Sequence, residues 1–265
     1  MIELAINLET IYPGMDFCEK IRSVHKAGFR AIEFWGWQDK DLKKVKATCR
    51  ELGMKIQAFS GTLSWSLCDR DSREAYINWI QKSIQTAQEL DCSNLILFPN
   101  HFTAEGCADF RNRYSREAMV ANITATLTAL APKLEQVGVT VLLEPLCNVG
   151  SDAGMSVTDT SVGADIVRAV NSPCVKLLCD VYHMQMMHGN LLKNITENLD
   201  IVPYIHLADA PDRHEPGTGE INFQYLLPQI KNNGFVGTVC FEYFPASDTE
   251  KGFPGLKWIQ TLFSE

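Results

Sequence analysis

Short apolar runs alternate with longer amphipathic segments along the chain, and this rhythm constrains the fold more than any other feature of the sequence. The short runs are rich in valine, isoleucine, leucine and phenylalanine and lack strict polar alternation, which is typical of parallel strands covered on both faces. Between them lie helix-like segments such as residues 73–90, in which apolar residues recur every two to four positions. The eight predicted strands are Leu4–Leu8, Ala31–Phe34, Lys55–Phe59, Asn94–Phe98, Thr140–Leu143, Val175–Cys179, Val202–His206 and Thr238–Phe241.

Glycines follow several predicted helices, at Gly28, Gly53, Gly138 and Gly234, where they permit the left-handed cap of a helix. Repeated strand–helix units predict the α/β class and a single (β/α)8 TIM barrel over residues 1–265, since such barrels run to roughly 250 residues. A doubly wound open sheet is the alternative. It requires a glycine-rich phosphate loop after the first strand, and residues 7–10 are not such a loop.

The overall charge and the cysteines restrict the possible partners and the compartment. The net charge of −8 disfavours nucleic acids and anionic membrane surfaces as partners. No apolar run approaches the roughly 18–20 residues needed to cross a bilayer, and no basic stretch precedes an apolar run at the N-terminus. None of the nine cysteines forms a CxxC pair. We therefore expect a reduced, cytoplasmic protein.

Four consecutive predicted strands, the fifth to the eighth, each end in a side chain that can bind a metal. These residues are Glu144, Asp180, His206 and Glu242. In a barrel these strand ends converge at the mouth where active sites lie. A lone acid at a strand end is often a helix cap or a solvated residue, but four in register favour a metal site. Three carboxylates and one imidazole suit one divalent ion such as Mn²⁺, Mg²⁺ or Co²⁺, which would compensate their buried charge.

Two further residues near these strand ends are candidates for substrate contact. His183 follows Asp180 by three positions, and it could contact a substrate oxygen or cap the next helix. Arg213 lies in a long polar loop, residues 209–222, and offers a fork of donors to a carboxylate or hydroxyl group. The alternative for Arg213 is a surface ion pair with an acidic neighbour in the same loop.

Three tryptophans and one glutamate lie near the expected mouth. Trp35, Trp37 and Trp65 follow the second and third predicted strands. They could form an aromatic wall for the apolar face of a sugar, or they could pack under loops, and the sequence leaves both alternatives open. Glu33 lies within the second strand, where it could point inward to a polar network, and we do not assign it as a metal ligand.

At these residues the sequence resembles the hydroxypyruvate isomerase family, within the xylose-isomerase-like barrel superfamily. The resemblance spans nearly the whole chain, and the run from Arg213 to Asn222 (RHEPGTGEIN) is its most specific part. The strand-end acids are shared by the wider superfamily, which includes ketose 3-epimerases. The resemblance is strongest in residues 142–146, 180–185, 206–209, 212–222 and 242–243.

The resemblance implies an isomerase that moves a proton next to the carbonyl of a small hydroxy-carbonyl substrate through an enediolate. It implies that Glu144, Asp180, His206 and Glu242 bind the metal and that Glu144 and Glu242 are the acid–base pair. It also implies that His183 and Arg213 contact substrate, and that the protein forms a homo-oligomer. The segments at residues 60–68 and 98–101 depart from the family pattern, which leaves the substrate open.

Three other functions are alternatives. A ketose 3-epimerase shares the chemistry and differs only in substrate and in the carbon that is reprotonated. An apurinic-site endonuclease-like metal hydrolase would use a multi-zinc cluster with histidines on more strands, whereas the third and fourth predicted strands end near Ser60 and Phe98 without an obvious ligand. A non-catalytic binding protein on a barrel scaffold is the third alternative, and the intact acid set argues against it.

Overall fold

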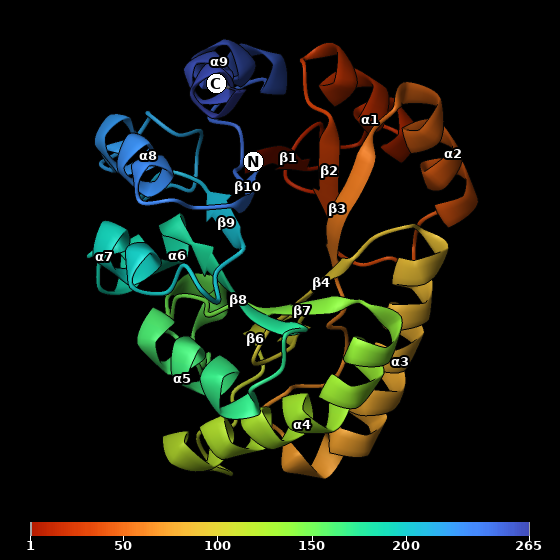
Figure 1. Ribbon diagram of the computed structural model, residues 1–265, viewed down its shortest axis with the longest axis vertical. Coiled ribbons are helices and arrows are strands. Elements are labelled where there is room, and N and C mark those ends of the chain that lie inside the picture. The colour runs from red at the N-terminus through yellow and green to blue at the C-terminus, as the bar shows by residue number, and fades with distance from the viewer. Residues whose placement is uncertain (1, 265) are drawn as a thin grey trace.

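The computed structural model describes residues 2–264, and its centre is a closed barrel of parallel strands (Figure 1). Around the barrel the strand order is β1-β2-β3-β4-β7-β8-β9-β10, and the pairing of β10 with β1 closes it. The prediction of a (β/α)8 barrel is thereby confirmed. The barrel strands are β1 (Ile2–Asn7), β2 (Ala31–Phe34), β3 (Lys55–Ser60), β4 (Asn94–Leu97), β7 (Thr140–Leu143), β8 (Val175–Asp180), β9 (Tyr204–Leu207) and β10 (Gly237–Phe241).

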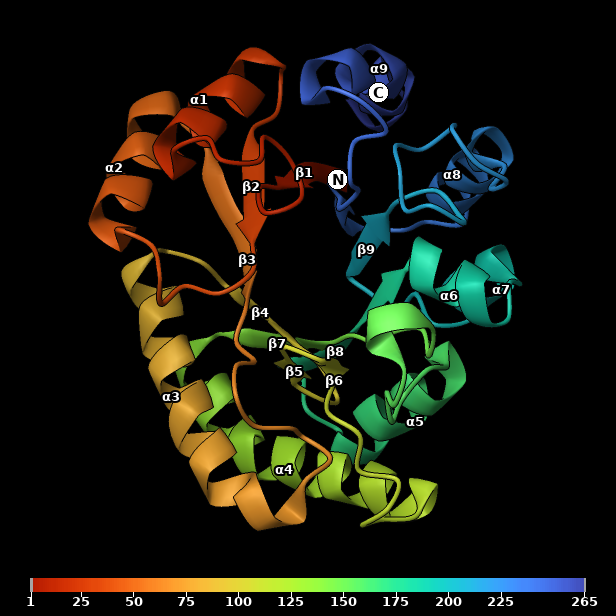
Figure 2. The same ribbon diagram turned by 180° about the vertical axis from the view of Figure 1, so that it is seen from behind.

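Helices surround the barrel and cover the outer faces of its strands (Figures 1 and 2). Among the described residues, no helix is both long enough and apolar enough to cross a membrane. The helices are α1 (Phe17–Lys26), α2 (Leu42–Leu52), α3 (Arg73–Glu89), α4 (Arg116–Val137), α5 (Thr160–Val170), α6 (Val181–Met187), α7 (Leu191–Thr196), α8 (Phe223–Asn232) and α9 (Thr249–Ser264), with short 3₁₀ helices η1 (Arg70–Ser72) and η2 (Gly150–Asp152).

The connection between β4 and α4 contains a feature that the apolar rhythm did not predict. It forms an antiparallel hairpin of β5 (Phe102–Thr103) and β6 (Gly106–Cys107), labelled in Figure 2, and β6 packs against η2. Each of these strands has only two residues, which is too short to produce a detectable pattern in the sequence. The predicted barrel strands agree with the observed ones to within two residues at each end.

The barrel interior is filled by one apolar side chain from each strand. Small residues from β10, β1, β2 and β3 face larger ones from β4, β7, β8 and β9, so the layer fills the space without a channel. A separate and larger core lies between the strands and the helices. The interior layer consists of Ala5, Ala31, Ala58, Ile96, Leu142, Leu178, Tyr204 and Cys240.

Candidate active site

The candidate site is the next inward-facing layer of the barrel. Successive residues of a strand point to opposite faces, so the residue two positions after each member of the apolar layer faces the interior again. Seven of these eight residues are polar, and they lie at the carboxyl ends of the strands, where TIM-barrel enzymes have their active sites. The layer consists of Asn7, Glu33, Ser60, Phe98, Glu144, Asp180, His206 and Glu242.

The structure brings together the four residues that the sequence suggests as metal ligands. One donor atom from each of Glu144, Asp180, His206 and Glu242 lies within 4.8 Å of the others, and all four side chains are buried. Nδ1 of His206 lies 3.2 Å from Oε1 of Glu144, 3.2 Å from Oε2 of Glu242 and 3.8 Å from Oδ2 of Asp180. Nitrogen and oxygen ligands about 2.0–2.2 Å from one ion lie roughly 3 Å apart, so the spacing fits a shared cation.

The electrostatics of this cluster also fit a cation. Oδ2 of Asp180 is buried and has no hydrogen-bond partner. Burial raises the pKa of Glu144 to about 8, against the attraction of His206. Burial opposes charge on His206 and on Glu242, but the surrounding carboxylates hold the pKa of His206 well above its usual range. His206 and Arg213 likewise hold the pKa of Glu242 well below its usual range. The cluster concentrates negative charge that a bound ion would compensate.

Arg213 points into the site and not toward the acids of its own loop. Its Nη2 atom lies 2.6 Å from Oε2 of Glu242 and 3.5 Å from Oδ2 of Asp180. The guanidinium lies over the rings of Tyr182 and Phe244, at 5.3 and 5.9 Å from the ring centroids. The surface ion pair that was the alternative for this residue is therefore wrong. Its Nε atom is buried without a partner and remains available as a donor.

His183 lines the cavity, and its backbone lies at the start of α6. Asp180 accepts the backbone N–H of His183 at 3.2 Å and so caps the helix, which leaves the imidazole free to face the cavity. Nδ1 of His183 accepts the backbone N–H of Cys147 at 3.2 Å, so the proton of the neutral ring is on Nε2. Burial lowers the pKa of His183, which favours this neutral form.

The side chains of Cys147, Asp152 and His183 also converge. Sγ of Cys147 lies 3.1 Å from Oδ2 of Asp152 and 3.2 Å from Nδ1 of His183. However, the lone pair of Nδ1 already accepts a backbone N–H, so it is not free for a second ion. We interpret this trio as a support that orients His183.

A cavity of about 430 Å³ opens above the cluster, and most of its wall is apolar. Trp35 lines it and donates its Nε1–H to Oε1 of Glu242 at 2.7 Å. Trp37 and Trp65 instead pack against Trp79, at centroid distances of 5.3 and 6.0 Å. Of the three tryptophans considered for an aromatic wall, only Trp35 therefore contributes to the cavity. The other apolar lining residues are Leu63, Phe98, Phe102, Leu146 and Phe244.

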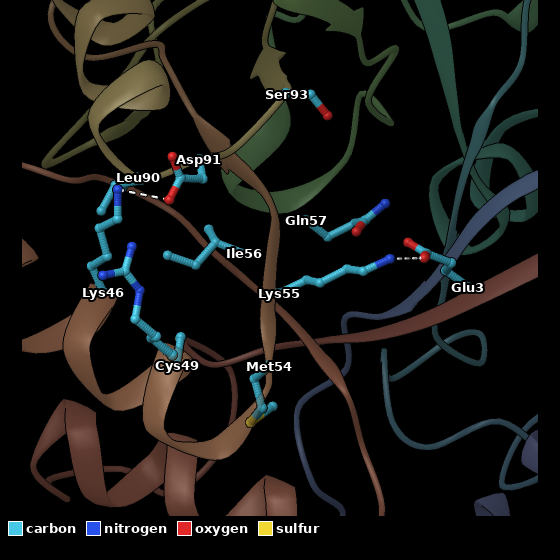
Figure 3. A pocket seen from close by; sticks show the side chains of 11 residues that line it. Glu3, Lys46, Cys49, Met54, Lys55, Ile56, Gln57, Leu90, Asp91 and Ser93 are labelled. Carbon is cyan, nitrogen blue, oxygen red and sulfur yellow. Dashed lines mark hydrogen bonds and ion pairs between the residues drawn. The ribbon is translucent and has the colours of Figure 1, made fainter.

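A second cavity, of about 380 Å³, lies at the opposite end of the barrel (Figure 3). It adjoins the amino-terminal ends of β1 and β3, and four of its five charged side chains form two ion pairs. Lys46 lies 2.7 Å from Asp91, and Lys55 forms an ion pair with Glu3; Figure 3 marks both contacts. Because these charges are already compensated and lie away from the carboxyl-end cluster, we do not consider this cavity a candidate active site.

Two residues of the polar layer, Glu33 and Asn7, were not among the site residues predicted from the sequence. Glu33 does point into a polar network, and its Oε2 atom lies 3.0 Å from Nε2 of His206. Asn7 was not singled out, although it donates to both Glu33 and Glu242. The signal that could have found it is its place two positions after Ala5, in register with the other members of the layer.

Comparisons with known proteins give the following matches. A family model described as xylose isomerase-like TIM barrel matches residues 21–262. A putative hydroxypyruvate isomerase of Danio rerio is 30% identical, over 98% of this chain and 95% of that protein. The hydroxypyruvate isomerase of Escherichia coli (strain K12) is 28% identical, over 98% of each chain. The 2-oxo-tetronate isomerase of Haemophilus influenzae is 28% identical, over 98% of this chain and 99% of that protein. These relatives confirm the prediction of an isomerase.

Two solved structures are also similar. A Brucella melitensis protein described as AP endonuclease, family 2, has a TM-score of 0.84 and 26% identity, over 98% of this chain and 99% of that one. A 3-keto-D-glucoside 4-epimerase from Escherichia coli has a TM-score of 0.84 and 20% identity, over 98% of this chain and 100% of that one. At this identity the second likeness shows the fold alone.

Proposed function

The chain belongs to the xylose isomerase-like TIM barrel family, and from this premise we propose that it is a divalent-metal-dependent isomerase of a small hydroxy-carbonyl compound, similar to hydroxypyruvate isomerase. The observation that carries the proposal is the convergence of Glu144, Asp180, His206 and Glu242 within 4.8 Å of one another at the ends of four consecutive barrel strands. The relatives named above support the reaction class. The same proposal assigns the protein to the cytoplasm, where its nine free cysteines would stay reduced.

In the proposed mechanism, Glu144, Asp180, His206 and Glu242 would hold one Mn²⁺, Mg²⁺ or Co²⁺ ion, which when bound supplies positive charge that polarises the substrate carbonyl. One of the two glutamates, Glu144 or Glu242, removes the proton from the carbon next to the carbonyl and so forms an enediolate. The same or the opposite glutamate returns a proton to the former carbonyl carbon, while the proton of the neighbouring hydroxyl passes to the former carbonyl oxygen, so that the carbonyl and the hydroxyl exchange places. Positioned acid–base groups of this kind contribute about 10²- to 10⁴-fold.

The remaining cavity residues orient the substrate. His183 lines the cavity and carries its proton on Nε2, 3.6 Å from Oδ2 of Asp180, so this N–H and the free Nε–H of Arg213 can donate to substrate oxygens beside the cluster. Most of the cavity wall is apolar, which lowers the local dielectric around these donors and strengthens their hydrogen bonds electrostatically.

Proton exchange in deuterated water tests the proposal. We expect NMR to show that metal-loaded protein exchanges the carbon-bound hydrogen of hydroxypyruvate for deuterium and converts the substrate. We expect Glu144→Gln and Glu242→Gln to lose more than nine-tenths of that turnover. The surface substitution Glu197→Gln is the matched control and should leave turnover unchanged. If either active-site variant keeps more than a tenth of wild-type turnover, the acid–base assignment is wrong.

The cavity favours a second candidate, a ketose 3-epimerase. Its volume of about 430 Å³ exceeds what a three-carbon acid needs, and four side chains at its mouth, Trp35, Leu63, Phe102 and Phe244, are 38–43% exposed. Arg213 is the only arginine or lysine among the described lining residues, and it is already paired with Glu242. An uncharged sugar would suit this wall better than a carboxylate. Inversion at the third carbon of fructose or ribulose would establish this activity.

We do not propose a nucleic-acid substrate, although one similar structure is described as an AP endonuclease. The net charge of −8 opposes binding to a phosphate backbone. In the described residues, β3 ends at Ser60 and β4 at Leu97, so these strands add no ligand for a multi-metal cluster. Cleavage of abasic DNA in the presence of Zn²⁺ would contradict this interpretation.

A further inference from the structure

A second group of buried polar side chains lies behind His206, on the side away from the three carboxylates. Nε2 of His206 lies 3.0 Å from Oε2 of Glu33, and the same oxygen accepts the hydroxyl of Tyr204 at 2.7 Å. Oε1 of Glu33 accepts from Nδ2 of Asn7 at 2.8 Å, and this nitrogen also donates to Oε1 of Glu242 at 3.1 Å. All five side chains are almost completely excluded from solvent.

The hydrogen atoms in this group can be placed by counting donors and acceptors. The oxygen of Asn7 accepts the backbone N–H of Glu9 at 2.8 Å, so its amide nitrogen faces Glu33 and Glu242 and gives one hydrogen to each. Both oxygens of Glu33 act as acceptors, one from Asn7 and one from Tyr204, as carboxylate oxygens do. Nε2 of His206 must therefore be the donor in its contact with Glu33.

This placement decides which imidazole nitrogen can bind an ion. With a hydrogen on Nε2, neutral His206 has its lone pair on Nδ1, which is the atom that faces Glu144, Asp180 and Glu242 at 3.2–3.8 Å. The opposite tautomer would direct an N–H group at the ion. Metal-binding histidines commonly donate their second ring N–H to a carboxylate, which fixes the tautomer and the ring orientation.

We propose that Glu33 is a positioning residue for the metal site: it holds His206 in the Nε2–H tautomer, and through Asn7 it also ties Glu242 in place. Glu33 is not one of the four ligands, because it lies at Nε2 of His206, on the side of the ring away from the Nδ1 atom that faces Glu144, Asp180 and Glu242. The inference rests on the metal site of the proposed function. The ligands at the ends of β9 and β10, His206 and Glu242, would therefore depend on side chains of β1 and β2.

Replacement of Glu33 by glutamine conflicts with this network in either orientation of the amide. If the amide nitrogen faces His206, the ring must switch its hydrogen to Nδ1, which then points at the ion. If the amide oxygen faces His206, the nitrogen faces the amide nitrogen of Asn7, and Asn7 must give up its contacts. Second-layer partners of this kind contribute about 10- to 100-fold to metal affinity.

The test is a double-mutant cycle on Mn²⁺ affinity, measured by calorimetry on folded proteins. We expect Glu33→Gln to weaken Mn²⁺ binding about 10- to 100-fold in the wild-type background. In a His206→Gln background, the ligand has no ring tautomer, and we expect Glu33→Gln to change the affinity by less than about threefold. Tyr204→Phe removes one donor to Glu33 but leaves the carboxylate beside His206, and as the matched control it should bind Mn²⁺ nearly as wild type.

A second measurement reads the tautomer directly. In ¹⁵N-labelled, Mg²⁺-loaded protein, the Nε2–H resonance of His206 should be present in the wild type and absent in His206→Gln, which assigns it among the six histidines. It should be shifted or lost in Glu33→Gln. If Glu33→Gln does not fold, Glu33→Asp takes its place, since it withdraws the carboxylate by one methylene and should weaken Mn²⁺ binding several-fold only when His206 is present.

The outcomes separate the inference from the proposed function. A folded Glu33→Gln or Glu33→Asp variant that binds Mn²⁺ as tightly as wild type overturns the positioning role and leaves the metal site standing. An equal loss in both backgrounds overturns it too, because removing a negative charge near the ion would then explain the effect without His206. Wild-type protein that binds no divalent ion contradicts the proposed function, and the inference fails with it.

Discussion

Asp180 uses its two carboxylate oxygens for different purposes. One oxygen accepts the backbone N–H of His183 and begins α6, while the other is buried without a hydrogen-bond partner, near the charged groups of Arg213 and His206. A helix cap and an ion ligand were competing interpretations of an acid at a strand end. In this site a single residue can satisfy both, because a carboxylate has two oxygens and the strand end directs one toward the helix and one toward the barrel axis.

At the residue scale, metal affinity should depend on pH. Without an ion, the raised pKa of Glu144, about 8, keeps this carboxyl protonated below that pH. The raised pKa of His206 likewise favours the imidazolium form, with a proton on both ring nitrogens. An ion must displace these protons, so the apparent affinity should rise with pH, about tenfold per unit for each proton released, and rise less steeply above about pH 8, where Glu144 no longer holds its proton. Calorimetry in buffers of different ionisation enthalpy would count the protons. An affinity that stays constant from pH 6 to 9 would contradict this expectation.

His183 should affect turnover more than metal binding. We expect His183→Ala to lower kcat/KM about 10²- to 10³-fold, because a preorganised donor is lost, while Mn²⁺ affinity changes less than about threefold. Steady-state kinetics and calorimetry check the two halves of this prediction. His188→Ala, at a half-exposed position one helix turn further on, is the control and should behave as wild type. A parallel loss of metal affinity in His183→Ala would show that this residue supports the metal site instead.

At the element scale, the loop between β9 and α8 positions Arg213. The loop is organised by Asp209, which is buried and accepts the backbone N–H groups of Ala210, Gly217 and Ile221 at 2.8–3.0 Å. Gly219 lies so close to this turn that an added Cβ would come within 2.0 Å of the carbonyl oxygen of Ala210. Arg213 therefore reaches Glu242 from a loop held by buried hydrogen bonds and close packing.

Substitution of Asp209 should loosen this loop. Asp209→Ala leaves three backbone N–H groups without their acceptor, those of buried Ala210 and Ile221 and of exposed Gly217, and we expect the free energy of unfolding to fall by about 2–3 kcal/mol. Because Arg213 loses its support, kcat/KM should fall more than tenfold as well. Urea denaturation and steady-state kinetics measure these effects. Asp212→Ala, at an exposed position of the same loop, should change the unfolding free energy by less than about 0.5 kcal/mol. Equal effects at both positions would contradict the role of Asp209.

At the scale of the whole molecule, the proposed ion would join ligands from four strands. Strands β7 to β10 form half of the barrel, and the polar contacts of Asn7 and Glu33 connect them to β1 and β2. Without an ion, only protons and Arg213 compensate the buried carboxylates at these strand ends. A cation should therefore stabilise the folded barrel as a unit.

Metal removal should lower the thermal stability. At a metal concentration of about 100 Kd, binding adds about 2.7 kcal/mol, which corresponds to a rise in Tm of about 5–10 °C for a chain of this size. Thermal denaturation after EDTA treatment, and again after adding Mn²⁺, measures the difference. A double variant, Glu144→Gln with Asp180→Asn, should show no rise on metal addition. The expectation fails if the double variant responds to metal as the wild type does.

The sequence by itself was enough to predict the barrel and the residues at its strand ends. Apolar runs mark strands buried on both faces, and a barrel with regular strands brings the carboxyl ends to one mouth, so Glu144, Asp180, His206 and Glu242 could be grouped without coordinates. Their roles as ligands and catalysts stay predictions. The two-residue strands of the β5–β6 hairpin could not be predicted, because two residues carry no periodicity.

Only the tertiary structure decided which side chains meet across the barrel. Glu33 and His206 are 173 positions apart, and their contact depends on how the strands are staggered when the sheet closes, which no local pattern records. The same is true of Arg213, which pairs with Glu242 and not with acids of its own loop, and of Trp37, which packs against Trp79 and not in the cavity. Local periodicity determines which way a strand residue points, but barrel closure determines what it touches.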